Sequence, residues 1–383
     1  MKFFHISDLH IGLKLHNRDL REDQEYVFSQ IAEYAADRQP DAVVIAGDIY
    51  DKSVPSAEAV ETFDRFLMDL RRALPEGEIM MISGNHDSAP RINCYRGILS
   101  GQKVHVIGQP PQSPSEHIAQ VTMSDEYGQV HFYLLPFVKP SMVKQIAGTD
   151  EKDNNLSYDE TLRRLLEREE IYTEDRNVLV SHQFYLPSGR KAEEIERMDS
   201  EVRTVGNIDE VSAEILHPFD YAALGHIHKP MKVGSERYRY CGTPLAYSVS
   251  EAGQEKALLE VELRQKGDVR ITALPFQPLR RVRILSGPLE KVLREATDDY
   301  VSVVLTDHVD LDVMEMQERL RQAFPNLLEI RRESVRRADY SHQSTADRPM
   351  DPLSLVCAFL GNDVNEEEKL LLQDVIQTVQ ERL

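Results

Sequence analysis

Histidine, aspartate and asparagine side chains gather in five short clusters within this 383-residue chain. The clusters are Asp8-Leu-His10, Gly47-Asp48, Gly84-Asn85-His86-Asp87, Ser181-His182 and Gly225-His226-Ile-His228. They offer nitrogen and oxygen donors without a thiolate, a ligand set that suits manganese, iron or zinc better than magnesium or calcium. A single ion would use roughly half of these groups, whereas two ions bridged by Asp48 and about 3.5–4 Å apart would use all of them. The clusters therefore predict a dinuclear metal site.

Each cluster directly follows a short apolar run that predicts a buried strand. The runs are Phe3–Ile6, Ala42–Ala46, Ile79–Ile82, Val178–Val180 and Tyr221–Leu224. Helical patterns lie between them, such as Ala57–Leu74 with Val60, Phe63, Leu67 and Leu70 on one face. This alternation predicts α/β layers with both sheet faces covered, and further runs at Val104–Ile107 and Val130–Leu135 indicate a large or doubled sheet. Because strand carboxyl ends form the ligand crevice of such folds, the five clusters are expected to converge.

Any one cluster alone would carry little weight, since a lone Asp-x-His is usually a solvated turn. The evidence for a metal site is that all five clusters occur along the sequence, each directly after an apolar run. Other histidines, such as His5, His16 and His131, have no such context and are expected to be surface or core residues.

A second, smaller unit is predicted after Pro275 and Pro278. Its expected strands and helices alternate: Arg281–Leu285, Leu289–Ala296, Tyr300–Leu305, Val313–Phe324 and Leu327–Arg331. A polar linker and two helices, Pro352–Leu360 and Glu366–Leu383, then close the chain. We therefore expect a main domain at 1–277, a small α/β domain at 278–337, a linker at 338–350 and a helical segment at 351–383.

Composition excludes several classes of protein. The net charge of −20 excludes coating of DNA or anionic membrane by bulk positive charge. The sequence has no apolar run of the roughly 18 residues that a membrane span needs, and its start, MKFFHISDLH, does not resemble a secretory signal. The three scattered cysteines, Cys94, Cys241 and Cys357, fit a reducing compartment. We expect a cytoplasmic protein with no membrane association.

The five clusters together resemble the active-site motifs of the calcineurin-like metallophosphoesterase superfamily. Longer segments resemble the bacterial branch of the meiotic-recombination nuclease family: HISDLHIG, VVIAGDIYD, SGNHDS, SHQF, FDYAALGHIHKP and YCGTPLAYSVSE. The resemblance is close over 1–278 and looser beyond. It implies a metallophosphoesterase nuclease domain of layered sheets flanked by helices, a small α/β capping domain and a C-terminal helical pair that binds a partner. Cys241 and Thr243 stand where small residues, often Ser, are usual, and no mechanistic consequence is expected.

The resemblance also implies the roles of individual residues. Two divalent ions, with Mn²⁺ as the expected metal, would be held by two sets that share Asp48. One set is Asp8, His10, Asp48 and His228, and the other is Asp48, Asn85, His182 and His226. His86 would bind no metal and would stabilise the scissile phosphate or protonate the leaving 3′ oxygen. Asp51 is a candidate to orient His86, with a solvated turn carboxylate as the alternative, and Asp87 is expected to fix the loop backbone.

The implied function is hydrolysis of DNA phosphodiester bonds in repair, recombination and replication. The resemblance implies single-strand endonuclease activity and, with an SbcC-type coiled-coil ATPase, ATP-dependent double-strand exonuclease activity and hairpin cleavage. It further implies a two-plus-two heterotetramer, with homodimer contacts expected at Ala57–Leu74 and Arg91–Leu99. Arginines of the small domain either contact DNA or form solvated faces: Arg280, Arg281, Arg283, Arg331, Arg332, Arg336 and Arg337.

Two alternatives use the same core. One is a metallophosphatase or cyclic-nucleotide phosphodiesterase that acts on a different ester. The other is a non-catalytic scaffold, against which the intact clusters argue, because buried acids and imidazoles without a function are costly to keep.

Overall fold

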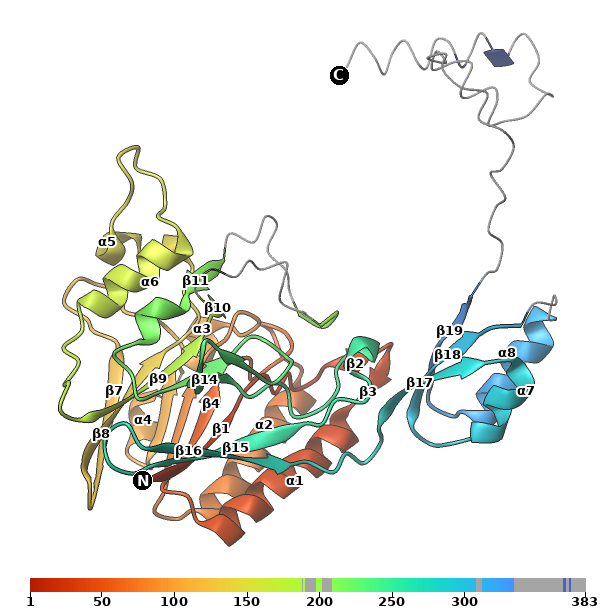
Figure 1. The fold of residues 1–383 in the computed structure, drawn as a ribbon, viewed down its shortest axis with the longest axis horizontal. Helices are drawn as coiled ribbons and strands as arrows, with labels where there is room; N and C mark the ends of the chain where they lie inside the picture. The colour runs from red at the N-terminus through yellow and green to blue at the C-terminus, as the bar shows by residue number, and fades with distance from the viewer. Residues whose placement is uncertain are drawn as a thin grey trace. The chain divides into compact units, whose positions relative to one another are not determined.

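The structure is a computed structural model that describes residues 1–94, 96–187, 189, 198–201, 209–307, 312–333, 368–369 and 372. The chain divides into two compact units, Met1–Glu333 and Ser334–Leu383. The predicted linker at 338–350 lies outside the described residues, as does the helical segment 351–383 apart from positions 368, 369 and 372. The boundary predicted after residue 277 falls inside the first unit and stays a prediction. Figure 1 labels most of the strands and helices of the first unit.

The first of two large sheets has six strands in the order β16-β15-β1-β4-β5-β6. Four of them run parallel: β1 (Lys2–Ile6), β4 (Ala42–Ala46), β5 (Glu78–Ile82) and β6 (Val104–Ile107). Their Val- and Ile-rich sequences are buried on both faces, as expected for the interior of a parallel sheet. The strands β15 (Ala257–Leu263) and β16 (Val269–Pro275) extend this sheet in antiparallel fashion.

The second sheet also has six strands, in the order β13-β14-β12-β9-β8-β7. Its parallel strands are β8 (Gly128–Leu135), β9 (Arg176–His182), β12 (Tyr221–Gly225) and β14 (Ser235–Tyr240). The edges are antiparallel: β7 (Ala119–Asp125) pairs with β8, and β13 (Met231–Val233) pairs with β14. The doubled sheet predicted from sequence is therefore confirmed.

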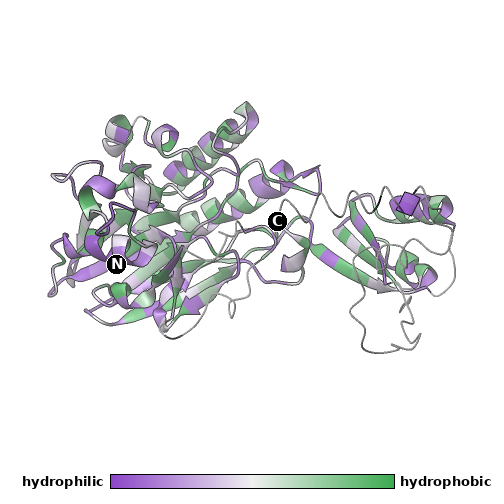
Figure 2. Ribbon diagram, turned by 90° about the horizontal axis from the view of Figure 1, so that it is seen from above, coloured by the Kyte–Doolittle hydropathy of each residue, from purple (hydrophilic) through white to green (hydrophobic). Residues whose placement is uncertain are grey.

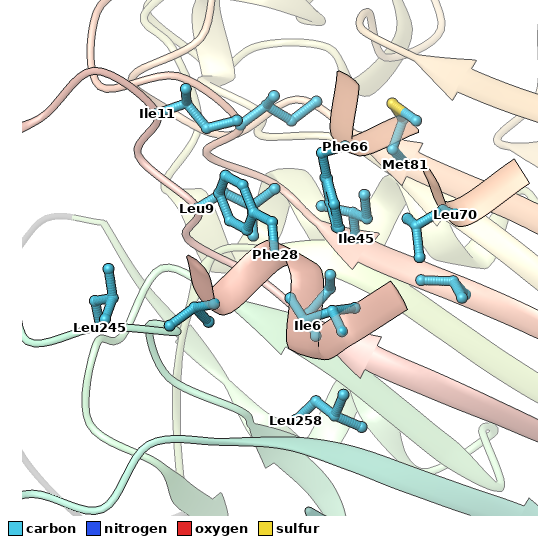
Figure 3. Close-up of a cluster of buried hydrophobic side chains, with 14 of the residues drawn as sticks. Ile6, Leu9, Ile11, Phe28, Ile45, Phe66, Leu70, Met81, Leu245 and Leu258 are labelled. Carbon is cyan, nitrogen blue, oxygen red and sulfur yellow. The ribbon is translucent and has the colours of Figure 1, made fainter. Parts of the chain in front are cut away.

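The two sheets pack face to face and helices cover their outer faces. Side chains such as Phe3, Val44, Phe132 and Val180 form the buried layer between the sheets. Outside the first sheet, α1 (Arg21–Arg38) and α2 (Ala57–Ala73) pack together, with the Phe28 and Phe66 rings stacked 4.6 Å apart (Figure 3). The helix α6 (Tyr158–Glu167) packs into the core cluster that the second sheet forms on its outer side.

The buried face of α2 differs from the predicted one. Its buried residues are Ala59, Thr62, Phe66 and Leu70. Val60 is 45% exposed, so the prediction was correct for Leu70 and wrong for Val60, because a small alanine and a threonine hydroxyl occupy the core face there. In Figure 2 the helices alternate between hydrophobic and hydrophilic positions, as helices with one buried face do. Among the described helices, none has both the length and the apolar composition to cross a bilayer.

The small α/β module has its own sheet and core. The strands β17 (Val282–Gly287), β18 (Tyr300–Leu305) and β19 (Leu327–Arg332) form a parallel sheet with β18 in the centre. The helices α7 (Leu289–Val292), continued by η6 (Leu293–Glu295), and α8 (Val313–Ala323) connect them, as predicted. Side chains such as Leu285, Val303, Leu320 and Phe324 form its core. Asp23 of α1 accepts hydrogen bonds from Arg280 (2.9 Å) and from the Tyr300 hydroxyl (2.8 Å), which ties the module to the main core.

Candidate metal centre

The five clusters converge where strands of both sheets end. Asp8 and His10 follow β1, Asp48 follows β4, and Asn85 and His86 follow β5, all in the first sheet. His182 is the last residue of β9, and His226 and His228 follow β12, in the second sheet. The metal centre thus depends on both sheets being docked.

The backbone at these turns is unusual. Asp8, His10 and Asp48 have φ angles of 53°, 42° and 49°, in the left-handed region that non-glycine residues rarely adopt. Strain of this kind gathers at functional sites, where the surrounding fold has to hold it. Glycine is needed beside these turns: a Cβ at Gly84 would lie 2.1 Å from Oδ1 of Asp48, and a Cβ at Gly225 would lie 2.0 Å from the Ala46 carbonyl oxygen.

One group of candidate ligands consists of Asp8, His10 and His228, all buried. The Nε2 atoms of His10 and His228 lie 3.1 Å apart, and Nε2 of His228 lies 4.0 Å from Oδ1 of Asp8. Burial lowers the pKa of His228 to about 3 and lowers the pKa of His10 well below its usual value. Both imidazoles are therefore neutral and carry lone pairs that a metal can accept.

A second group surrounds the side chain of Asn85. Its Oδ1 lies 3.1 Å from Nε2 of His182 and 2.9 Å from Nδ1 of His226. The other ring nitrogen of His182 donates to the Ala46 carbonyl at 2.8 Å, so Nε2 is the atom left for a ligand. Burial lowers the pKa of His182, but the Asp48 carboxylate outweighs burial and raises this pKa to about 9.

Asp48 lies between the two groups. Its Oδ2 is 3.2 Å from Nε2 of His182 and 3.6 Å from Nε2 of His10. Its Oδ1 accepts a hydrogen bond from the backbone N–H of His86 at 2.9 Å. Asp48 can thus present one oxygen to both groups.

The donor chemistry tests whether divalent metal ions fit here. Candidate ligand atoms lie within 4.8 Å of one another in three trios: Asp8–His10–His228, Asp8–Asp48–His182 and His10–Asp48–His86. Burial, together with the nearby Asp48 carboxylate, raises the pKa of Asp8 to about 7. Two divalent ions would offset the cost of burying two carboxylates close together, so these His and Asp clusters are consistent with a dimetal site.

His86 lies at the mouth of the centre. Its Nδ1 is 2.9 Å from the backbone carbonyl oxygen of Asp51, and its ring meets that of His10 edge-on at 4.7 Å. A carbonyl oxygen only accepts hydrogen bonds, so Nδ1 carries the proton and Nε2 is left for the cleft. The orienting contact comes from the main chain of Asp51, whereas the sequence suggested its carboxylate. That carboxylate lines the cleft, and burial raises its pKa.

The Asp87 carboxylate fixes the loops around the centre. It accepts hydrogen bonds from the backbone N–H groups of Ile49 (3.0 Å), Tyr50 (2.9 Å) and Gly84 (2.9 Å). The segments after β4 and β5 are thereby held together, which confirms the structural role expected for Asp87.

A cleft of about 670 Å³ opens beside the centre. Its walls include His86, Asn85 and His226 from the centre, together with two lysines, Lys52 and Lys139. Phe137 also lines it, with its ring stacked on His226 at 6.4 Å between centroids. The cleft therefore combines two lysines, the carboxylates of Asp51 and Asp209, and an aromatic surface next to the candidate ligands.

Sequence reasoning missed the residues behind His228. Oγ of Ser200 lies 2.7 Å from Nδ1 of His228, and Glu201 accepts a hydrogen bond from the His228 backbone N–H at 3.0 Å. Ser200 also donates to Glu251 at 2.7 Å. Glu251 ends the segment YCGTPLAYSVSE, which sequence reasoning noted as a whole. Ser200 lies outside that segment, in a polar stretch that gave no signal of its own.

Comparison with known proteins agrees with this geometry. Residues 1–230 match the family model described as calcineurin-like phosphoesterase. Residues 275–362 match the model SbcD_C, described as the type 5 capsule protein repressor C-terminal domain. The chain is 30% identical over 342 residues to the D subunit of the nuclease SbcCD from Staphylococcus epidermidis, covering 86% of this chain and 84% of that protein.

Similarity to solved structures is more distant. A dimetal phosphatase from Danio rerio is 14% identical, with a TM-score of 0.39, and the match covers 71% of this chain and 95% of that one. The protein TT1561 of Thermus thermophilus is 12% identical, with a TM-score of 0.37 and coverage of 71% and 98%.

The first family model spans more than half of the chain, and the Staphylococcus relative aligns over most of both proteins. The chain belongs to the calcineurin-like phosphoesterase family, in its SbcD branch.

Proposed function

We propose that this chain is a metal-dependent DNA nuclease and the nuclease subunit of an SbcCD-type complex. The observation that carries the proposal is the position of Asp48, with one oxygen facing both His10 and His182. Asp8, His10, Asp48 and His228 would hold one ion, and Asp48, Asn85, His182 and His226 would hold the other. Two divalent ions, with Mn²⁺ as the expected metal, would supply a hydroxide-like nucleophile near neutral pH and offset charge on the phosphate oxygens.

His86 would act on the leaving group. Its Nδ1–H is bound by the Asp51 carbonyl, which holds the ring in one orientation. Nε2 can then hold a proton close to the 3′ oxygen of a phosphodiester bound in the cleft. A histidine placed in this way serves as general acid, and it also stabilises negative charge on the phosphate.

The cleft fits a single-stranded nucleic acid substrate. Lys52 and Lys139 supply local positive charge in a chain whose net charge is −20. Phe137 offers a ring for stacking of an unpaired base. Two of the candidate arginines are less available for phosphate contacts, because Arg280 pairs with Asp23 (2.9 Å) and Arg331 pairs with Glu329 (2.7 Å).

The proposed assembly pairs two copies of this chain with two SbcC-type ATPase subunits. Exposed apolar side chains support a homodimer: Val54, which lines the cleft, is 65% exposed, Val60 in α2 45%, and Ile98 in α4 (Arg96–Ser100) 72%. A monomer in light scattering of the isolated protein at micromolar concentration would count against the homodimer.

Two of the three cysteines, Cys94 and Cys241, are free thiols, in keeping with a cytoplasmic protein.

The proposal is tested by digestion of a defined DNA hairpin in the presence of Mn²⁺. We expect the isolated chain to cut the single-stranded loop, and the chain with its ATPase and ATP to process the duplex as well. Cyclic AMP and a phosphopeptide serve as competing substrates. Turnover of either one without cleavage of DNA would favour the phosphodiesterase or phosphatase alternative.

A further inference from the structure

We infer that Ser200 and Glu251 are positioning residues that fix the tautomer and direction of His228 for metal binding. This inference rests on the proposed dimetal function. His228 presents Nε2 to His10 and Asp8 at the centre, while Nδ1 on the far side of the ring contacts Oγ of Ser200 at 2.7 Å. A metal-binding histidine needs its second nitrogen held in this way, because that contact decides which nitrogen keeps the lone pair.

The direction of each hydrogen bond follows from the chemistry of Glu251. Its Oε1 lies 2.7 Å from Oγ of Ser200, and a carboxylate only accepts. The single hydroxyl proton of Ser200 therefore points to Glu251, and the Ser200 oxygen has to accept from Nδ1–H of His228. This arrangement excludes the tautomer with a proton on Nε2, so the lone pair faces the centre.

Glu251 is itself held rigidly. Its Oε2 accepts from Nζ of Lys256 at 2.6 Å and from the Thr243 hydroxyl at 3.0 Å, and its Oε1 also accepts from Ser248 at 2.9 Å. Glu251 is fully buried and Lys256 is 7% exposed. Together with Ser200, these groups make four donors to the Glu251 carboxylate, which accepts all four hydrogen bonds.

Buried ion pairs add little net stability over a well-packed apolar pair, so stability alone explains Glu251–Lys256 poorly. The pair instead anchors a series of hydrogen bonds that runs from Lys256 through Glu251 and Ser200 to His228. Lys256 also holds His228 directly, because its Nζ donates to the His228 backbone carbonyl at 3.2 Å.

The Nδ1 atom of His228 is held by a side chain, whereas Nδ1 of His182 is held by the Ala46 carbonyl of the main chain. No single side-chain truncation removes the acceptor that holds Nδ1 of His182, whereas the contact that holds Nδ1 of His228 depends on two side chains. This asymmetry predicts that one of the two metal sites can be weakened selectively.

The test is Mn²⁺ binding by calorimetry on the full-length protein, together with thermal unfolding. Ser200→Ala removes the acceptor for Nδ1–H of His228. Glu251→Gln introduces an amide N–H that can donate to Ser200 and so reverse the direction of these hydrogen bonds. Each should weaken one of the two Mn²⁺ sites by about 10–100-fold and leave the other unchanged. Ser200→Thr, which restores the hydroxyl, should recover the affinity.

Ser248→Ala is the matched control, because it removes a hydrogen bond to the same Glu251 oxygen without touching His228. It should keep both sites. Equal losses of Mn²⁺ affinity or of thermal stability in Ser200→Ala and Ser248→Ala would overturn the inference, as would unchanged affinity in Ser200→Ala and Glu251→Gln. Failure of the unmodified protein to bind Mn²⁺ would instead overturn the proposed dimetal function.

Discussion

Oδ2 of Asp48 lies 3.2 Å from Nε2 of His182, and this contact joins the two sheets at the metal centre. Asp48 follows β4 of the first sheet, and His182 ends β9 of the second. Neither sheet alone carries all of the proposed ligands, so the candidate site depends on the face-to-face packing of the sheets.

His86→Ser should separate metal binding from chemistry. The substitution removes the ring that faces the cleft but none of the proposed ligands, so cleavage of single-stranded DNA should slow by about 10²–10⁴-fold while two Mn²⁺ remain bound. Single-turnover kinetics and metal analysis of the same sample measure both effects. Loss of an ion together with activity would make His86 a ligand, as its place in the trio with His10 and Asp48 allows.

Lys52→Gln and Lys139→Gln should weaken substrate binding. Both lysines line the cleft, so each substitution should raise KM for single-stranded DNA more than it lowers kcat. Removal of one phosphate contact should also reduce the slope of log affinity against log salt by about 0.7. Lys232→Gln is the control, since Lys232 lies outside the cleft lining and contacts Glu236. Identical salt slopes in all three variants would rule out both contacts.

Asp125→Asn should destabilise the protein in a pH-dependent way. Burial opposes ionisation of Asp125, but hydrogen bonds from the buried Arg176 dominate and hold the pKa of Asp125 well below its usual value. A carboxylate with a lowered folded-state pKa stabilises the fold above its unfolded pKa of about 3.9, and this contribution is lost as pH falls toward the folded value.

Breaking this pair leaves Arg176 buried without its counter-ion, so we expect a loss of about 3 kcal/mol at pH 7. Urea unfolding between pH 7 and pH 3 measures it. The difference between the natural protein and Asp125→Asn should shrink as the pH falls. A difference that stays constant over this range would contradict the assignment.

The sequence predicted the ligand-bearing strands well because each is a continuous apolar run that ends abruptly in polar residues. The same logic does not identify the buried polar side chains of α1, where Asp23 and Gln24 lie in the buried face beside Val27, Phe28 and Ile31. Gln24 donates to the backbone carbonyls of Leu9 and His10, so a polar side chain supports the turn at the centre. Periodicity of apolar residues finds the helix but cannot predict which polar side chains are buried with it.

Contacts made by the main chain or by single hydroxyls were also beyond sequence reasoning. The family resemblance made the Asp51 carboxylate a candidate to orient His86, whereas the Asp51 backbone carbonyl oxygen makes the contact. Ser200 reaches His228 across 28 positions of the sequence. Such contacts depend on how loops pack after the sheets have docked, and residue types alone do not encode them.

Truncation after Asp347 tests the predicted helical segment 351–383, which lies largely outside the described residues. If that segment binds the ATPase, the shortened chain should keep Mn²⁺-dependent cleavage of single-stranded DNA and lose co-purification with the partner. An insoluble or inactive shortened chain would mean that the segment belongs to this protein's own core.

The most direct test of the metal centre is Mn²⁺ titration of Asp48→Asn, with His182→Ala beside it. Since one carboxylate oxygen faces both groups of ligands, Asp48→Asn should lower the affinity for both ions, whereas His182→Ala should empty mainly one site. Calorimetry should therefore report two Mn²⁺ per natural chain, about one for His182→Ala and weak binding at both sites for Asp48→Asn. An Asp48→Asn protein that binds two Mn²⁺ as tightly as the natural chain and cuts DNA normally would contradict the shared-carboxylate centre.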